Sequence, residues 1–208
     1  MLLLLWSRIM KLIDAYQKIA ELNVSVFQTR DVSAYLNISV SHASKILERL
    51  ALSSQVVHLA HGRWGLRDRI DILQLPELLT MPYPSYISLQ TALYYQGMIS
   101  QVPTVIYAVS LATSRCFNTP LGTVSIHHMQ PDLFCGYKTD DNNIKMATPE
   151  KALVDLLYLS PAKTRLFASL PELELGEDFN RTLAEEYINM IPSQRRRTLV
   201  ATLFTKLS

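Results

Sequence analysis

Residues 28–50 read QTRDVSAYLNISVSHASKILERL and hold the most informative pattern in the chain. The first part predicts a short helix, for which Thr29 is a suitable N-cap. Its expected inward face is formed by Val32, Tyr35 and Leu36. The segment 37–40 then interrupts the helical spacing, so we expect the chain to turn there.

A second helix is expected from about Val40 to Leu50, capped by either Ser39 or Ser41. The side chains predicted to face inward are Ala43, Ile46, Leu47 and Leu50. A short helix, a turn of three or four residues and a second helix are typical of a helix-turn-helix.

The flanking sequence extends this interpretation. Ile9 to Leu22 carries apolar residues at three- and four-residue steps, which predicts an amphipathic helix before the pair. Residues 55–59 and 64–66 predict two strands around a turn at 61–63. A hairpin that directly follows the second helix is typical of a wing. We therefore predict a winged helix-turn-helix domain over residues 1–70.

Residues 71–84 are punctuated by three prolines and are predicted to form a linker, with a short helix as the alternative. Residues 85–208 are predicted to form a mixed α/β C-terminal domain. Its expected helices span 87–96, 148–159, about 181–190 and about 194–206, and its expected strands span 105–110, 123–128 and 134–138. The fold class predicted for the whole chain is α+β.

The charge is distributed unevenly along the chain. Residues 1–70 hold nine lysines and arginines against five acidic residues, although the net charge of the whole sequence is only +2. The positive excess therefore lies in the predicted winged domain, where a phosphate backbone would meet it. The apolar content of 49% and the charged content of 18% are those of a folded protein.

The candidate DNA contacts follow from the predicted inward face of the second helix. The N-terminal half of such a helix enters the major groove, so the side chains nearest base edges are expected to be Ser41, His42, Ser44 and Lys45. Phosphate contacts are expected from Arg30, Arg49 and Arg63. His61 and Arg63 at the tip of the wing are placed to enter a minor groove. The alternative is that these polar residues form an ordinary solvated surface used for protein contact.

No catalytic or metal-binding pattern emerges from the sequence. Asp132 has no Glu-x-Lys partner of the nuclease kind, and residues 150–151 are expected only to open a helix. The adjacent histidines 127–128 point to opposite faces of a strand and cannot share a metal. Cys116 and Cys135 have no metal-binding spacing and are expected to be free thiols. We therefore expect neither enzymatic activity nor a cofactor.

Two charged clusters lie near the C-terminal end, an acidic one at 172–178 and a basic one formed by Arg195, Arg196 and Arg197. Each is expected to be a solvated surface, with a secondary contact to DNA or a partner as the alternative for the arginines. No apolar run approaches about 20 residues. The run 1–6 is too short for a signal peptide. A cytoplasmic protein without membrane contact is expected.

Several stretches resemble the AbiEi-type antitoxin family. They are Tyr86–Gly97, Gln101–Pro103, Val105–Ala108, Thr119–Gly122, Leu133–Gly136 and Ala147–Tyr158. With the winged head, the likeness covers roughly residues 10–160. Its most specific part is the helix start Thr-Pro-Glu-Lys-Ala-Leu at 148–153.

The resemblance implies one half of a type IV toxin–antitoxin operon. Proteins of that family repress their own promoter by binding inverted repeats through the winged head. Their C-terminal domain counteracts a nucleotidyltransferase-like toxin, described as acting without a stable complex. The alternative that the residues leave open is a plain winged-helix transcriptional regulator, whose C-terminal domain senses a ligand or dimerises.

Overall fold

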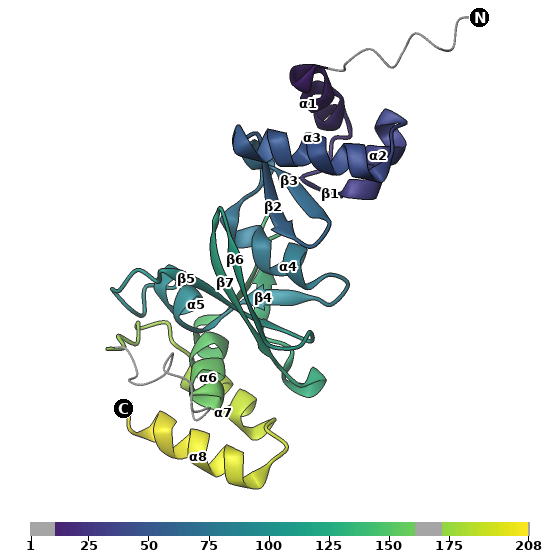
Figure 1. Ribbon diagram of the computed structural model, residues 1–208. Helices are drawn as coiled ribbons and strands as arrows, with labels where there is room; N and C mark the ends of the chain where they lie inside the picture. The colour runs from purple at the N-terminus through teal and green to yellow at the C-terminus, as the bar shows by residue number, and fades with distance from the viewer. Residues whose placement is uncertain (1–10, 161–171, 208) are drawn as a thin grey trace, which may run out of the picture. The chain divides into compact units, whose positions relative to one another are not determined.

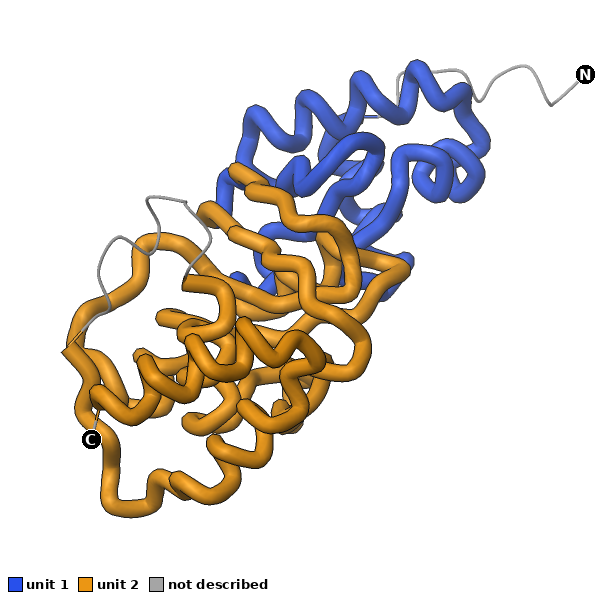
Figure 2. Tube along the Cα trace, turned by 90° about the horizontal axis from the view of Figure 1, so that it is seen from below, with its two compact units in different colours: residues 1–72, 119–121 blue, residues 73–118, 122–208 orange. Residues whose placement is uncertain are grey.

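The computed structural model describes residues 11–160 and 172–207 and shows a mixed α and β protein. It separates into two compact units, shown in different colours in Figure 2. The first comprises residues 1–72 with 119–121, and the second comprises residues 73–118 with 122–208. Residues 9–10, with which the first predicted helix begins, lie outside the described residues.

The first unit combines three helices with a small antiparallel sheet of strand order β1-β3-β2 (Figure 1). Its elements are α1 (Leu12–Glu21), β1 (Val26–Gln28), α2 (Thr29–Leu36), α3 (Val40–Leu52), β2 (Val56–Ala60), β3 (Arg63–Leu66) and the 3₁₀ turn η1 (Arg67–Arg69). The strand β1 was not expected. It is only three residues long and pairs along β3, from Val26 opposite Gly65 to Gln28 opposite Arg63.

Helix α2 begins one residue away from the expected cap. Gln28 is the N-cap, and its backbone N–H donates to Asp31 Oδ2 at 2.7 Å. Thr29 is therefore the first helical residue, and the prediction that it caps the helix was wrong. The helix ends at Asn37, which adopts φ +52°, and the Ile38 N–H donates to the Ser33 carbonyl across the turn. This is the Schellman arrangement that stops a helix and redirects the chain.

Helix α3 follows the prediction closely. Ser39 is its cap and accepts from the His42 N–H at 3.3 Å. Its four expected inward residues are all buried: Ala43, Ile46, Leu47 and Leu50. Tyr35 of α2, also expected to face inward, is instead 46% exposed, and its hydroxyl bonds to Glu21 of α1. The core of this unit is completed by Ala15, Ile19, Phe27, Val32, Val56, Trp64 and Leu66.

The second unit contains a six-stranded mixed sheet of order β6-β7-β5-β4-β9-β8. Its strands are β4 (Ser85–Ile87), β5 (Val105–Ser110), β6 (Arg115–Thr119), β7 (Gly122–His128), β8 (Tyr137–Thr139) and β9 (Lys145–Ala147). Its helices are α4 (Leu75–Thr80), α5 (Leu89–Tyr95), α6 (Pro149–Leu159), α7 (Arg181–Asn189) and α8 (Gln194–Thr205), with 3₁₀ turns at Ile72–Gln74 and Pro131–Leu133. The pairs β5–β7 and β4–β9 are parallel, whereas β4–β5 and β8–β9 are antiparallel.

Residues 71–84 contain the short helix that was the alternative to a linker: α4 lies there and buries Leu75 and Leu79. Two other predictions for this region need correction. The expected helix 87–96 starts later, since Ile87 belongs to β4 and pairs with both Ala108 and Met146. The expected strand 134–138 is largely an irregular segment that follows a 3₁₀ turn, and only its last two residues enter β8.

The buried core of the second unit joins the sheet to α5, α6, α7 and α8. Helix α6 packs against α5, α7 and α8, which places it at the centre of the helical layer (Figure 1). Thr148 caps α6 and Pro149 occupies its first turn, close to the expected start of the helix at 148. Among the described residues, no helix combines the length and the apolar character needed to cross a membrane.

The substitution Gly136→Ala should lower the free energy of unfolding more than Gly97→Ala. Both glycines have a left-handed backbone, with φ +71° and +72°, so alanine costs about 1–2 kcal/mol at either position. At Gly136 the added Cβ would also lie 2.8 Å from Tyr187 Oη and 2.9 Å from Lys151 Cγ, whereas at Gly97 it meets nothing within 4 Å. Denaturant unfolding of the two variants tests this, and equal losses would contradict the packing described around Gly136.

Candidate nucleic-acid interface

The first unit carries an open groove of about 1290 Å³ on one side of α3. Three segments form its walls: the β1–α2 junction, the outer side of α3 and the β2–β3 hairpin. The lining residues are Gln28, Thr29, Arg30, Val40, Ser41, Ser44, Lys45, Glu48, Ala51, Leu52, His58, His61, Gly62, Arg63 and Trp64. A surface helix flanked by a hairpin and by the start of a second helix is thus presented to solvent.

The burial of one face of α3 determines which side chains reach this groove. Because the inward face is apolar and fully buried, the residues between its members point outward. Ser41, Ser44, Lys45 and Glu48 recur at three- and four-residue steps and therefore share one side of the helix. The helix has 13 residues, about 20 Å of length.

Trp64 fixes the hairpin to the start of α2. Its indole Nε1–H donates to Thr29 Oγ1 at 3.0 Å, and its ring lies 4.6 Å from the His58 ring, centroid to centroid. The backbone N–H of Thr29 also donates to the Gly62 carbonyl at 3.0 Å. Gly62 forms the hairpin turn with φ +67°, a conformation that glycine adopts without strain. The wall formed by the hairpin is therefore held in place by both side-chain and backbone bonds.

The charges that line the groove are mainly basic. Arg30, Lys45 and Arg63 contribute cations, and Glu48 is the one carboxylate among the lining residues. The Arg30 Nε–H donates to Gln28 Oε1 at 2.9 Å. Arg30 is exposed at the start of α2. An exposed basic groove of this kind attracts a polyanion.

The eight residues expected to contact DNA fall into two groups. Six of them line the groove, namely Arg30, Ser41, Ser44, Lys45, His61 and Arg63. His42 and Arg49 are exposed on α3 but do not line it. Glu48 also lines the groove but was not predicted to do so, although its position three and four residues after Lys45 and Ser44 places it on the same side of the helix.

The basic cluster at the start of α8 is partly used within the second unit. Arg196 donates through Nε and Nη2 to the Tyr158 carbonyl, at 3.1 and 2.7 Å, and its guanidinium lies 4.8 Å from the Tyr158 ring centroid. Arg197 donates in the same way to the Ile191 carbonyl, at 2.9 and 2.7 Å. These bonds satisfy carbonyls at the ends of α6 and α7. Arg195 remains exposed.

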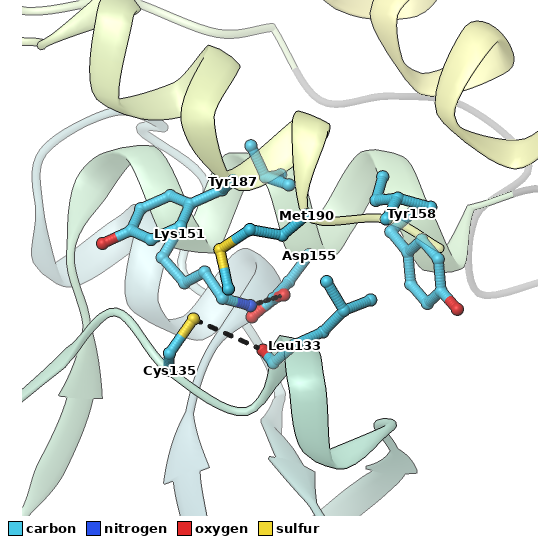
Figure 3. Close-up of a pocket in the computed structure, with 9 residues that line it drawn as sticks. Leu133, Cys135, Lys151, Asp155, Tyr158, Tyr187 and Met190 are labelled. Atoms are coloured by element: carbon cyan, nitrogen blue, oxygen red, sulfur yellow. Dashed lines mark hydrogen bonds and ion pairs between the residues drawn. The ribbon is translucent and has the colours of Figure 1, made fainter. Parts of the chain in front are cut away.

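A buried polar cluster lies beneath α6 in the second unit (Figure 3). Lys151 and Asp155, only 2% and 1% exposed, form an ion pair one turn apart on that helix. Asp155 Oδ2 also accepts from Tyr86 Oη at 3.0 Å and from Ser88 Oγ at 2.8 Å, while Lys151 Nζ donates to Tyr86 Oη at 3.0 Å. Burial, and then the Asp155 carboxylate, raises the pKa of the Tyr86 hydroxyl, so it stays protonated. The cluster ties α6 to β4.

This cluster was not predicted, because a carboxylate in the first turn of a helix is also favourable through the helix dipole alone. A usable signal was present: Glu150, Lys151 and Asp155 are the charged residues of an otherwise apolar helix. All three are buried, and the Glu150 carboxylate accepts from the Asn180 N–H at 3.0 Å. Charges on a helix with apolar residues all round have to be buried and paired.

A small cavity of about 10 Å³ adjoins this cluster. Its lining residues are Leu133, Cys135, Lys151, Val154, Asp155, Tyr158, Tyr187, Met190 and Ile191, most of them labelled in Figure 3. This volume is comparable to one water molecule and far below the ~300 Å³ of a small-molecule pocket. Burial raises the pKa of the Cys135 thiol, and the Lys151 ammonium opposes part of that effect. The geometry supports a structural role for the cluster.

The two adjacent histidines of β7 use different partners. His127 Nε2 lies 3.1 Å from Ser125 Oγ, and burial lowers the pKa of His127 and favours its neutral form. His128 Nδ1 lies 3.1 Å from the Ala112 carbonyl oxygen. Within residues 11–160 and 172–207, no three His, Cys, Asp or Glu side chains are grouped closely enough to hold a metal ion.

No family model matches the chain, and no curated protein sequence is similar to it.

The substitution Asp155→Asn should lower the free energy of unfolding by about 3–5 kcal/mol, because it leaves the Lys151 ammonium buried without its counter-charge. The matched control is Lys145→Met at the Lys145–Glu77 pair, whose side chains are 21% and 34% exposed. An ion pair with side chains as exposed as these contributes about 0–1 kcal/mol to the free energy of unfolding. Denaturant unfolding of both variants tests the difference, and a similar small loss in each would show that the buried cluster is not a structural anchor.

Proposed function

We propose that the first unit is a winged helix-turn-helix that binds double-stranded DNA, and that the chain is a transcriptional regulator. The element order supports this proposal: α1, α2, a tight turn, α3 and then a hairpin paired with a short strand. In this assignment α3 is the recognition helix and the β2–β3 hairpin is the wing. The proposed activity is binding, and we assign no catalytic group.

The observation that carries the proposal is the groove itself. One side of α3 is buried and apolar, while the other is largely polar and faces a groove that carries three basic side chains against one carboxylate. B-DNA has a major groove that admits one α-helix. Ser41, Ser44 and Lys45 in the first two turns of α3 are assigned to base edges. Arg30 at the start of α2 and Arg63 on the hairpin are assigned to phosphates.

A second candidate is a protein-docking surface. Val40 and Leu52, at the two ends of α3, line the same groove and are 55% and 88% exposed. Exposed apolar side chains of this size favour contact with an apolar partner. The DNA proposal is preferred because four of the five lining residues between them on α3 are polar or charged: Ser41, Ser44, Lys45 and Glu48. In a DNA complex the two apolar side chains are suited to contact thymine methyl groups.

The DNA proposal predicts that the purified chain binds its own upstream DNA more tightly than a scrambled duplex. Lys45→Ala should reduce that preference by about 1–3 kcal/mol, because it removes a base contact. Arg63→Ala should weaken both complexes and lower the salt slope by about one, because it removes a phosphate contact. Titrations at several salt concentrations measure both effects.

The matched control is Arg49→Ala, which removes a charge from the same helix outside the groove. It should leave the preference for the upstream duplex intact. If the wild-type chain binds neither duplex, the groove is not a DNA-binding surface and the docking candidate replaces it. If Arg49→Ala and Lys45→Ala reduce the preference equally, the assigned orientation of α3 on DNA is wrong.

We further propose that the regulator is an autorepressor and antitoxin that counteracts a nucleotidyltransferase-like toxin. The support is the resemblance of residues 86–158 to the AbiEi-type antitoxins, whose most specific segment forms the start of α6. The alternative is a regulator whose second unit senses a ligand or dimerises. This alternative is favoured by a hollow of about 260 Å³ in the second unit, which is lined in part by Lys138, Asp140 and Thr148.

The antitoxin proposal predicts that a neighbouring reading frame encodes the toxin and arrests growth when it is expressed alone. Co-expression of this chain from an unrelated promoter should restore growth. Lys45→Ala should restore growth equally well, because the substitution affects the DNA-binding groove and the promoter is no longer its own. Failure of the wild-type chain to restore growth would leave the plain regulator as the better account.

A further inference from the structure

Glu48 lies among the residues that line the groove and is the one carboxylate there. It follows Ser44 and Lys45 on the exposed side of α3. A binding surface that served only to attract phosphates would gain nothing from this charge, because a carboxylate repels the DNA backbone.

The neighbouring serine holds the Glu48 carboxylate in place. Ser44 Oγ donates to Glu48 Oε1 at 3.1 Å, one helical turn away on the same side of α3. Ser44 is half-buried and Glu48 is exposed. Oε1 therefore has a partner within the helix, and the Glu48 carboxylate lines the groove as an acceptor.

The major-groove edges of the bases offer few partners to such an acceptor. Guanine presents only the acceptors N7 and O6, and thymine presents the acceptor O4 with a methyl group. Adenine presents its N6 amino donor beside the N7 acceptor, which would face the carboxylate. Cytosine presents the N4 amino donor with its own C5–H on one side and the paired guanine O6 on the other, whereas adenine N6 is flanked by acceptors on both sides. A single carboxylate oxygen therefore suits cytosine best.

We propose that Glu48 is a specificity-determining residue that accepts a hydrogen bond from the N4 amino group of one cytosine in each half-site. This inference rests on the proposed function, because it requires α3 to lie in the major groove. The negative charge of Glu48 repels phosphates and so opposes non-specific contact with the DNA backbone. It also disfavours guanine at that position, because guanine presents only acceptors. Its benefit is discrimination between duplexes rather than overall affinity.

The test is selection of bound duplexes from a pool with a randomised central segment, using the full chain. Wild type, Glu48→Gln and Asp14→Asn are compared at one salt concentration. Asp14→Asn is the matched control, because it removes a charge from an exposed position on α1 that does not line the groove. Wild type and Asp14→Asn should enrich the same motif, with cytosine favoured on the order of tenfold at one position.

Glu48→Gln should lose the cytosine preference at that position and gain a preference for adenine, since glutamine pairs with adenine N6 and N7. This switch is a gain that a misfolded variant would not show. If Glu48→Gln enriches the same motif as wild type, the inference is overturned while DNA recognition by the groove stands. If wild type enriches no motif, both the inference and the proposed function fail.

Discussion

The bond from the Trp64 indole to the Thr29 hydroxyl connects the two parts of the first unit that form its groove. Thr29 starts α2, and Trp64 lies in the hairpin strand that pairs with β1. Trp64 is buried in the core together with Phe27, so the bond forms in a partly apolar setting where an unpaired indole N–H would be costly. The position of the hairpin relative to the start of α2, and with it one wall of the groove, therefore depends on this contact.

The remaining features of the groove follow from that constraint. Because the hairpin is fixed in place, the buried face of α3 determines which α3 side chains point into the space between the helix and the hairpin. Lys45 and Glu48 then occupy the same surface with opposite charge, one suited to guanine acceptors and the other to an amino donor. In the second unit, the corresponding constraint is the buried pair Lys151–Asp155, which joins a helix to a strand and leaves a cavity of about 10 Å³.

The helical part of the first unit was predictable because its apolar residues recur at helical spacing and Ser39 provides a cap. Strand β1 was not, since three residues are too few for an alternating pattern and its pairing partner lies almost 40 residues further on. The residues before α5 were assigned to the helix for a related reason: Ile87 is apolar, and only its pairing with two strands makes it part of the sheet.

The residues of the candidate site were also predictable only in part. Six of the eight expected contact residues line the groove, three of them on α3 because its inward face was correctly identified, whereas His42 and Arg49 do not line it. The arginines of α8 illustrate a different limit. A run of three basic residues suggests an exposed patch, but the carbonyls that occupy Arg196 and Arg197 belong to residues that local sequence cannot associate with them.

The central claim, that the groove beside α3 receives duplex DNA, is tested most directly by mapping backbone amide chemical shifts of the full chain on addition of its own upstream duplex. The account predicts that the largest changes fall in three separate segments, 28–30, 40–52 and 58–64, which contain all the residues that line the groove. Changes confined to the second unit, with none in these three segments, would contradict it.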